Sequence, residues 1–503
     1  MSYDAIVIGY GPAGATMANL LGQRDWRVAV VERSRTVYAD PRAITADHEA
    51  MRVFQHIGLA EEITRGTVPH PGTDFVGADG LPIKHYEPAP PPYLLGWEPN
   101  FMFCQPELEA VLRRGVDRFP NVEVMLGRSC RAVWQDEDGV RVQVDDDVLS
   151  AKYLVACDGA SSGVRRDLAA SLDDLAFDEW WVVVDTHVSG DAELPERVTQ
   201  YCRPERPGTY IVGPGALRRW EIKLLPGEDP EEFRAPEKVR SVLGRFVDVG
   251  QVDIQRVAVY RFHALVVDRW RHGRIFLMGD AAHQMPPFLG QGMCAGIRDT
   301  VNLAWKLDGV ERQGFDASLL DTYGQERKPH VRAVVETTKS LGVIIGETDP
   351  VEAARRDDTL RNLPRMTSVR QKSIPGLDSG LIALDEGGPG VAAGELFPQP
   401  RTSQGALLDD VIGAGFWLVV HRDDVLDQEL RGTWAEVSGH IVHVTEEMDP
   451  DRLVRGWSEQ FDAAAVIVRP DRYVFGAARD RDHLRGLVVD LVRRLRGGTA
   501  VRS

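Results

Sequence analysis

Three glycines near the start of the chain have the spacing of a phosphate-binding turn. Gly9, Gly11 and Gly14 form G-x-G-x-x-G between the apolar run Y-D-A-I-V-I and a segment of helical periodicity. The first glycine permits the tight bend, the second admits a pyrophosphate, and the third lets helix and strand pack closely. Glu32 closes the next apolar run, where a carboxylate can accept hydrogen bonds from ribose hydroxyls. The pattern predicts a dinucleotide site but leaves FAD and NAD undecided.

Two further turns that combine aspartate and glycine follow apolar runs later in the chain. Asp158 and Gly159 come after K-Y-L-V-A-C, and Gly279 and Asp280 come after R-I-F-L-M. An aspartate at such a strand end can bond ribityl hydroxyls, and a glycine-rich loop lets backbone amides approach a flavin edge or an anion. Each turn taken alone can be purely structural. Together with the glycine motif they favour FAD.

The three motifs, in this order, resemble those of the class A flavoprotein monooxygenases, the family of para-hydroxybenzoate hydroxylase and phenol hydroxylase. Within that family the chain is most similar to the 3-(3-hydroxyphenyl)propionate hydroxylases, through the segment from Pro41 to Ala50, N-L-A-W-K-L, and R-P-D-R ending at Arg472. The resemblance implies an FAD-dependent monooxygenase that consumes NADH or NADPH as a transient electron donor. It would hydroxylate a phenolic substrate with O2 through a flavin C4a-hydroperoxide.

The resemblance also assigns roles to individual residues. It places Glu32 at the adenosine ribose, and Arg42 and Gln105 at the flavin nucleotide. Asp158 would serve both FAD and NAD(P)H, and Asp280 would bind the ribityl-pyrophosphate part of FAD. The complete set of cofactor-binding residues that it implies is Gly9, Gly11, Pro12, Ala13, Gly14, Glu32, Arg33, Arg42, Gln105, Asp158, Gly159, Gly279, Asp280, Pro287, Gly290, Gly292 and Met293.

Hydroxylation of a phenol near neutral pH needs a group that attracts or accepts the phenolic proton, because the pKa of a free phenol is about 10. Asp47, His48 and His283 are the ionisable residues best placed by sequence for this catalytic work. Asp47 has an alternative role as a helix N-cap, and His283 has one in orienting the flavin loop.

We expect six residues to line the substrate pocket: Trp97, Phe103, Trp181, Tyr201, Tyr210 and Pro286. Ordinary core packing is the alternative for the aromatic ones. The expected substrate is an aromatic acid similar to 3-(3-hydroxyphenyl)propionate, and the alternative is an aromatic polyketide or another large phenol. A flavin dehydrogenase or reductase, and a non-catalytic FAD-binding protein, are hypotheses of other classes.

The composition of the chain limits the kinds of partner that we expect it to bind. A formal charge of -17 disfavours nucleic acid and anionic membranes. The cysteines Cys104, Cys130, Cys157, Cys202 and Cys294 form no C-x-x-C pair, so we expect neither disulfides nor a metal site. Without a leader or an apolar run of about 20 residues, the chain is expected to be cytoplasmic. A small aromatic molecule and O2 are then the expected partners, and a homodimer is left open.

The elements that must position these residues predict an α/β fold. We expect an FAD-binding Rossmann-like domain of the glutathione-reductase type over 1–177 and 266–345, with some substrate-domain strands near 70–104. The pattern predicts an antiparallel substrate-binding sheet over 178–265, a linker of little periodicity over 346–393, and a small α/β module over 394–503. The family resemblance implies that this module is thioredoxin-like and without redox cysteines. Helices are expected over 41–59 and 319–341.

Overall fold

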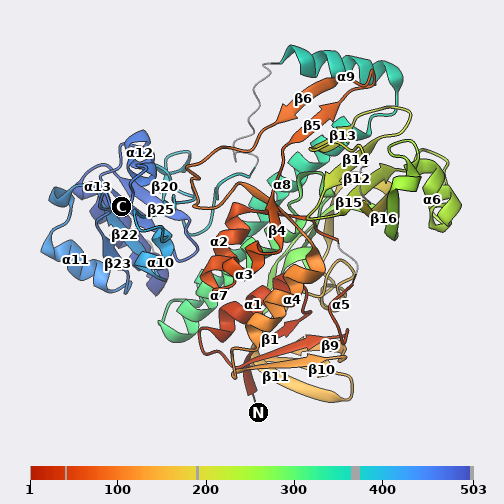
Figure 1. The fold of residues 1–503 in the computed structure, drawn as a ribbon. Coiled ribbons are helices and arrows are strands. Elements are labelled where there is room, and N and C mark those ends of the chain that lie inside the picture. The colour runs from red at the N-terminus through yellow and green to blue at the C-terminus, as the bar shows by residue number, and fades with distance from the viewer. Residues whose placement is uncertain (1, 40–41, 189–191, 364–373, 499–503) are drawn as a thin grey trace.

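Two eight-stranded sheets and a smaller four-stranded one form most of the β-structure of this mixed α/β protein. The computed structural model describes residues 2–39, 42–188, 192–363 and 374–498. Figure 1 shows the first sheet near the N-terminus, the second on the opposite side, and the four-stranded sheet in a separate C-terminal module. The long helices α7 (Gly292–Arg312) and α8 (Thr322–Gly346) run between these parts.

The first sheet has a parallel core in the order β18-β11-β1-β2-β8, because β1, β2 and β11 are apolar runs buried on both faces. The hairpin β9–β10 extends it through β11, and β17 pairs antiparallel with β18. The strands are β1 (Ser2–Ile8), β2 (Val28–Glu32), β8 (Val122–Leu126), β9 (Cys130–Gln135), β10 (Val140–Val144), β11 (Asp147–Ala156), β17 (Arg271–His272) and β18 (Ile275–Leu277).

Helix α1 (Pro12–Gly22) follows β1 directly and is buried from Gly14 to Gly22. It contacts α4 (Gln105–Val116) and α7, so neighbouring helices cover it. A helix that is buried all round holds the turn in front of it in a fixed place. Shorter helices near this sheet are α2 (His48–His56), α3 (Ala60–Thr64) and α5 (Gly163–Asp167).

The second sheet is mostly antiparallel, in the order β19-β16-β12-β15-β14-β13-β5-β6. Its strands come from three stretches of the chain: β5 (Thr73–Val76), β6 (Pro82–Tyr86), β12 (Leu172–Val188), β13 (Val198–Tyr201), β14 (Gly208–Val212), β15 (Leu217–Lys223), β16 (Val252–Val267) and β19 (His283–Gln284). One face packs on α6 (Pro236–Leu243) through an aromatic core. The other face is turned toward the first sheet.

Two stretches differ from the sequence expectation. The helix expected over 41–59 begins only at His48, because residues before it form β3 (Thr45–Asp47), which pairs with β7 (Asn100–Phe103). Strand β7 also pairs with β4 (Thr67–Pro69), so tertiary pairing overrides the local helical pattern. Pro41 itself lies outside the described residues.

The stretch 346–393 is predicted to be a linker because its sequence has little periodicity. In the structure it contains the 13-residue helix α9 (Pro350–Asn362). Asp349 caps this helix and a proline occupies its first turn, two start signals that were present in the sequence. The helix packs against β6, and Asp357 accepts a hydrogen bond at 2.7 Å from Ala78 N in the turn between β5 and β6. Two short strands follow, β20 (Leu384–Asp385) and β21 (Gly388–Pro389).

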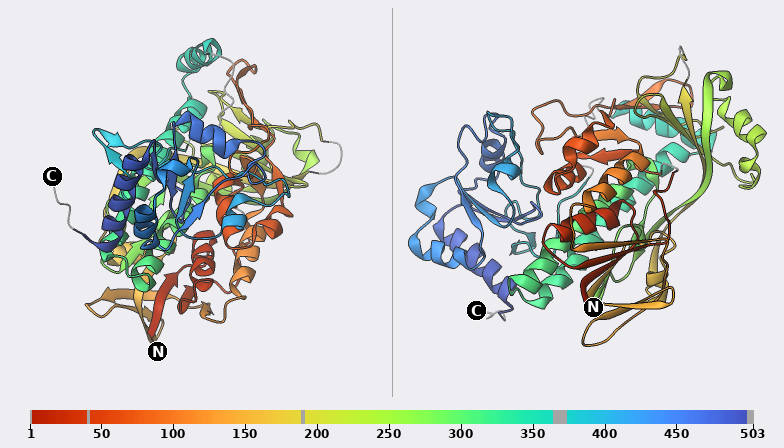
Figure 2. Two further views of the ribbon diagram at one scale, coloured as in Figure 1. Left: turned by 90° about the vertical axis from the view of Figure 1, so that its left-hand side faces the viewer. Right: turned by 60° about the horizontal axis from the view of Figure 1, so that its bottom comes forward.

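The C-terminal module contains a sheet in the order β23-β22-β24-β25 with helices around it. Figure 2 shows it beside the helical part of the first domain. Buried ion pairs and hydrogen bonds join the two parts, among them Arg52 with Asp409 and Arg469 with Glu326. The elements are α10 (Leu408–Ile412), β22 (Trp417–Val420), α11 (Gln428–Ala435), β23 (His440–Val442), α12 (Leu453–Gln460), β24 (Ala465–Val468), β25 (Val474–Ala478) and α13 (Arg481–Arg496).

All five cysteines are free thiols. Within the described ranges, no helix has the length and apolarity needed to span a bilayer. The same part of the chain holds no group of three or more His, Cys, Asp or Glu side chains arranged to bind a metal ion.

Replacement of Arg469 tests how strongly the module is attached. Arg469 is fully buried and pairs with Glu326 of α8 and with Asp471. We expect Arg469→Met to lower the free energy of unfolding by about 3–5 kcal/mol, because it leaves buried carboxylates without their cation. Urea unfolding followed by tryptophan fluorescence measures this. Arg422→Ala, which removes an exposed pair with Asp424, is the matched control, and equal unfolding curves for both variants would contradict the assignment.

Candidate cofactor and substrate site

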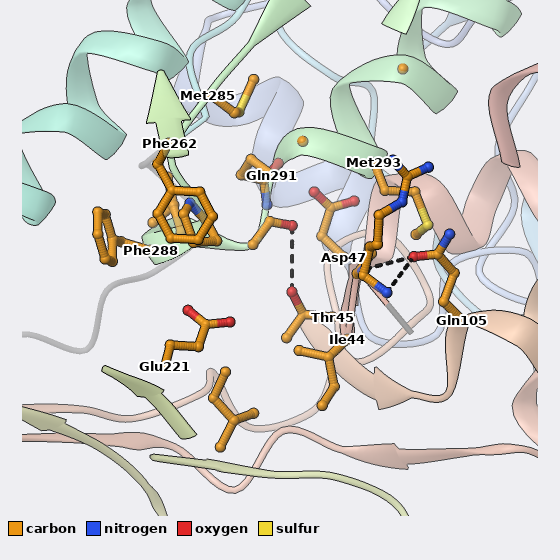
Figure 3. Close-up of a pocket in the computed structure, with 18 of the residues that line it drawn as sticks. Ile44, Thr45, Asp47, Gln105, Glu221, Phe262, Met285, Phe288, Gln291 and Met293 are labelled. Atoms are coloured by element: carbon orange, nitrogen blue, oxygen red, sulfur yellow. Dashed lines mark hydrogen bonds between the residues drawn. The ribbon is translucent and has the colours of Figure 1, made fainter. Parts of the chain in front are cut away.

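A cavity of about 660 Å³ lies between the loops that follow β1, β11 and β18 of the first sheet and one face of the second sheet. This face, opposite the one that packs on α6, is called the inner face below. The cavity wall includes the start of α1, the turn η3 (Gly279–Ala281), the loop before α7, and side chains of β13, β14, β15 and β16. Figure 3 shows Glu221 of β15, Phe262 of β16 and Phe288 of the loop before α7 around one open space. One cavity therefore connects the predicted dinucleotide turn with the second sheet.

The glycine turn has the geometry that its spacing predicts. Gly9 has a φ of +96°, and a Cβ there would lie 2.3 Å from the Cys157 carbonyl oxygen. A Cβ on Gly14 would lie 2.0 Å from the Gly9 carbonyl oxygen. By contrast, a Cβ on Gly11 would meet nothing within 4 Å, and Gly11 lines the cavity together with Pro12 and Ala13. Gly9 and Gly14 are thus required by the fold, while Gly11 leaves space for a ligand.

The start of α1 is suited to an anion. Gly11 is the N-cap, and as a glycine it has no side chain to cap the first turn. Such a helix start offers backbone N–H donors and a partial positive charge to a phosphate. Glu32 lies behind the turn, where its carboxylate oxygens accept from Tyr10 N and Ser34 N at 2.8 Å each. The next residue, Arg33, is exposed, and neither acid nor arginine lines the cavity.

The second and third motifs lie side by side. Arg165 donates to the carbonyl oxygens of Ala160 and Ala281 at 2.6 and 3.0 Å, so it ties the loop after β11 to the turn η3. Gly159, Gly279 and Asp280 line the cavity. Asp158 Oδ2 accepts from Val164 N at 3.1 Å, whereas its buried Oδ1 has no hydrogen-bond partner among the described residues. An orphaned buried carboxylate oxygen beside the cavity is consistent with a polar ligand.

Gln105 fixes the loop that carries Arg42. The buried side chain of Gln105 begins α4, and its Oε1 accepts from Arg42 N at 3.0 Å and from Ala43 N at 2.6 Å (Figure 3). Both Gln105 and Arg42 line the cavity. The exposed Arg42 side chain is therefore held at the cavity by its own backbone.

Asp47 is both a helix cap and an ion-pair partner. Its Oδ1 accepts from Ala50 N at 2.9 Å, and its Oδ2 pairs with Arg298 of α7. Burial alone raises the pKa of Asp47, but Arg298, His48 and the Ala50 N–H together hold it below its ordinary value. Asp47 lines the cavity as a stable carboxylate, which makes it a weak proton acceptor.

Arg298 also holds the loop before α7 and the first residues of that helix, 287–293, a segment called the flavin loop below. It donates to Gln291 Oε1 at 2.9 Å and pairs with Glu49. The loop residues Pro287, Gly290, Gln291, Gly292 and Met293 line the cavity. Gly290 has a φ of +66°, and a Cβ there would lie 2.0 Å from Thr45 Oγ1, so the loop passes close to β3.

The two histidines predicted to be catalytic differ in position. His48 lines the cavity, and burial lowers its pKa to about 4, so the imidazole is neutral near pH 7. His283 is 1% exposed and lies outside the cavity wall, stacked on Trp270. Its Nε2 is 3.0 Å from Asp299 Oδ2, which also accepts from Gly279 N at 3.1 Å. His283 therefore supports the Gly279–Asp280 turn instead of reaching a substrate, which corrects its predicted catalytic position.

The six predicted substrate residues do not line the cavity, although all are described. Tyr201 and Tyr210 point to the opposite face of the sheet, into the core against α6. Trp181 lies one layer behind Phe262 and Phe288, with ring centroids 6.2 and 5.0 Å away. The remaining three are also not lining residues: Trp97 donates to Gln55, Phe103 is in the first core, and Pro286 is buried between the lining residues Met285 and Pro287. The alternative of core packing holds for the aromatic residues.

The alternation of side chains along a strand explains this difference. Where Tyr201, Tyr210 and Trp220 face the core, their neighbours face the cavity. These neighbours are Gln200, Thr209, Ile211, Arg219 and Glu221, and Tyr260 and Phe262 come from β16. Buried polar residues that alternate with aromatic ones were the sequence signal for this surface, and sequence reasoning missed it by choosing the aromatic positions.

The polar part of the inner face is a connected network. Asp185 of β12 accepts from Arg219 Nε at 2.7 Å and from Arg256 Nη1 at 2.9 Å. Arg256 also contacts the Tyr260 hydroxyl, and Thr209 donates to Gln200 at 2.5 Å. Glu221 lies beside this network and is 5% exposed. Burial raises its pKa to about 7, against the opposing effect of Arg219.

Comparison with protein families agrees with this geometry. The FAD binding domain family matches residues 2–338, and the HcaD C-terminal domain family matches residues 394–492. The chain belongs to the FAD binding domain family. The glycine turn, the orphaned Asp158 oxygen and the open start of α1 fit this cofactor, and the resemblance to the class A flavoprotein monooxygenases is confirmed.

Relatives of this FAD-binding protein are similar over nearly their whole length. A probable NADH-specific resorcinol 4-hydroxylase of Rhodococcus jostii strain RHA1 is 37% identical, over 97% of this chain and 94% of the relative. A 3-(3-hydroxy-phenyl)propionate/3-hydroxycinnamic acid hydroxylase of Mycobacterium sp. strain JLS is 34% identical, over 94% and 89%.

Solved structures share the fold at lower identity. The flavin-dependent monooxygenase PieE, in complex with FAD and substrate, has a TM-score of 0.79 at 21% identity and covers 99% of this chain and 100% of its own. Aklavinone-11 hydroxylase, in complex with FAD and aklavinone, has a TM-score of 0.79 at 23% identity, with 98% and 99% covered.

Two glycine variants separate folding from cofactor binding. Gly11→Ala places a methyl group in open space, so the apoprotein should keep its melting temperature, while FAD binding weakens by about tenfold or more, or about 1.4 kcal/mol. Gly14→Ala places its methyl group against the Gly9 carbonyl and should prevent correct folding. Differential scanning fluorimetry and FAD titration of the apoprotein measure both effects. A Gly11→Ala variant with unchanged FAD affinity would refute the position of the pyrophosphate.

Proposed function

We propose that this protein is an FAD-dependent, NAD(P)H-consuming monooxygenase that hydroxylates a phenolic aromatic substrate. The observation that carries the proposal is the single cavity that connects the FAD turn with the inner face of the second sheet. Apolar side chains such as Ile44, Phe262, Met285 and Phe288 form much of this space, as expected for an aromatic ring (Figure 3). The names of the two similar hydroxylases support a phenol as substrate.

The cofactor roles follow the order of the motifs. Gly11, Pro12 and Ala13 would hold the pyrophosphate and Glu32 the adenosine ribose. Asp280 would bind the ribityl-pyrophosphate part, and Asp158 would serve both FAD and NAD(P)H. Arg42 and Gln105 would border the flavin from one side. When bound there, FAD would take electrons from NAD(P)H and activate O2 for transfer to a ring. The remaining members of the proposed cofactor-binding set are Gly9, Gly14, Arg33, Gly159, Gly279, Pro287, Gly290, Gly292 and Met293.

The loop before α7 would place the flavin ring next to the substrate. Gly290, Gly292 and Met293 line the cavity beside Thr45, and Arg298 holds Gln291 in that loop. Asp47 would act on this loop through Arg298, because its carboxylate is already paired and has a low pKa. His48, neutral near pH 7, would present hydrogen-bonding nitrogens to the same region.

The domain division is part of the proposal. The FAD-binding domain would comprise 1–177 and 266–345, and 178–265 would form an inserted substrate domain with strands near 70–104. The pairing of β5 with β13 supports this addition. The four-stranded sheet with flanking helices supports a thioredoxin-like module over 394–503, and none of its residues is a cysteine. Helix α9 places part of the predicted 346–393 linker against β6.

Oxygen transfer is the decisive test of the function. We expect resorcinol or 3-(3-hydroxyphenyl)propionate to accelerate NADH or NADPH oxidation and to gain one 18O atom from 18O2, as measured by mass spectrometry. Fast reduction with slow reaction toward O2 and no labelled product would favour a dehydrogenase or reductase. FAD that neither donor reduces would favour a non-catalytic flavoprotein, and either outcome would refute the monooxygenase.

Substitution of Asp47 tests its positioning role. We expect Asp47→Asn to lower kcat for hydroxylation by about tenfold or more while FAD affinity changes less, because Arg298 loses one of its two carboxylates. Asn retains the capping oxygen for Ala50 N, so α2 should stay intact. Steady-state product formation and FAD titration are the measurements. Unchanged product formation would leave Asp47 with its capping role alone.

A further inference from the structure

Glu221 is a buried carboxyl group in the wall of the cavity. It is 5% exposed and lies in the middle of β15, opposite Thr209 of β14 and Val183 of β12, which line the same cavity. Figure 3 shows its carboxyl group directed into the open space beside Phe262 and Phe288 and across from Thr45. Its nearest cation among the described residues, Arg219 Nη1, lies 3.9 Å away, and a buried acid without a short hydrogen-bonded partner is costly, so its position calls for a reason.

The cations nearest to Glu221 are engaged elsewhere. Arg219 Nη1 is 3.9 Å from Glu221, while its Nε donates to Asp185 at 2.7 Å and its Nη1 to the Arg42 carbonyl at 2.6 Å. Arg256 pairs with the same Asp185. Further along β16, Arg261 pairs with Asp178.

The charges on this inner face therefore balance. Asp185 and Glu221 carry two negative charges when both are ionised, and Arg219 and Arg256 carry two positive ones. A substrate carboxylate placed here would meet an ionised Glu221 and two arginines already held by Asp185, so it would gain little net attraction. A phenolic hydroxyl, in contrast, can donate a hydrogen bond to Glu221.

Resting on the proposed function, we propose that Glu221 is a catalytic residue that accepts the proton of a substrate phenol, and that it selects uncharged phenols over aryl carboxylates. The phenolic O–H bond breaks and an O–H bond forms on Glu221. The freed electron pair moves into the ring, and the ortho or para carbon forms a C–O bond to one atom of O2. The O–O bond breaks, and the second oxygen atom leaves as water, with the two electrons supplied by NAD(P)H through FAD. The ring carbon then loses its hydrogen as a proton, and Glu221 returns its own proton to the phenolate oxygen.

The ionisation of Glu221 suits this role. Its pKa of about 7 makes the carboxylate available near neutral pH, with Arg219 of β15 and with Asp185 and Arg256 of the neighbouring strands as the charged groups around it. Because this pKa is raised, the accepting form dominates above pH 7 and is lost as the pH falls below it.

Glu221→Gln tests the proposal, because glutamine keeps the shape and cannot accept the proton. We expect kcat/KM for resorcinol at pH 8 to fall by about 10²-fold, with loss of the wild-type rise in kcat/KM between pH 6 and 8. The FAD content of the purified variant should stay unchanged, because Glu221 is proposed to contact the substrate and not the cofactor. Glu228→Gln, which removes a carboxylate paired with Arg206 outside the cavity wall, is the matched control and should keep wild-type kcat/KM.

A comparison of two substrates tests the proposed preference for uncharged phenols. Wild-type kcat/KM should be at least about tenfold higher for resorcinol than for 3-(3-hydroxyphenyl)propionate, and Glu221→Gln should narrow that ratio. A Glu221→Gln variant with wild-type kcat/KM and pH profile would overturn the inference, and so would a wild-type preference for the propionate. Neither result would contradict the proposed hydroxylation.

If the wild-type enzyme transfers no 18O to any phenol, the proposed function itself is refuted. Should Glu221→Gln not fold, Glu221→Asp, with a displaced carboxylate, must show reduced kcat/KM that retains the pH dependence.

Discussion

The site depends on the ion pairs that the buried guanidinium of Arg298 forms. Arg298 is 2% exposed and lies among Asp47, Glu49 and Gln291, which come from β3, α2 and the flavin loop. Burial opposes its charge, but the two carboxylates outweigh burial and raise its pKa well above the ordinary value. Because a desolvated cation is tolerated only with all of its partners in place, this one residue fixes three segments around the cavity.

The same constraint extends to the C-terminal module. Tyr473 donates to Glu49 Oε1 at 2.7 Å, so the module contacts the second carboxylate of Arg298. A second buried network joins Arg469 and Asp471 of the module to Glu326 of α8 and to Asn302 of α7. The helix that carries Arg298 is therefore held from both sides, which gives a module without cysteines a structural role at the flavin loop.

The cavity combines two kinds of wall for physical reasons. The first domain supplies backbone turns, because a pyrophosphate is bound best by N–H groups at a helix start. The second sheet supplies side chains, because alternate residues of adjacent strands project to one face. Its inner face carries apolar residues around the balanced group of Asp185, Arg219, Arg256 and Glu221, so a ring can be enclosed while one carboxyl group remains near it.

The sequence by itself determined the parallel FAD-binding core and the position of its turns, because Gly9, Gly14 and the strand-end aspartates are read from local spacing. It also indicated helix capping as an alternative to the catalytic role of Asp47, and the structure shows Asp47 as the N-cap of α2. Only the tertiary structure decided which side chains meet the substrate space. Glu221 and Tyr210 both lie on β-strands with alternating patterns, yet one face is covered by α6 and the other by the flavin loop. Contacts between segments that are distant in the sequence decide which face of the sheet packs on α6 and which faces the cavity. The local periodicity of a strand contains no information about these contacts.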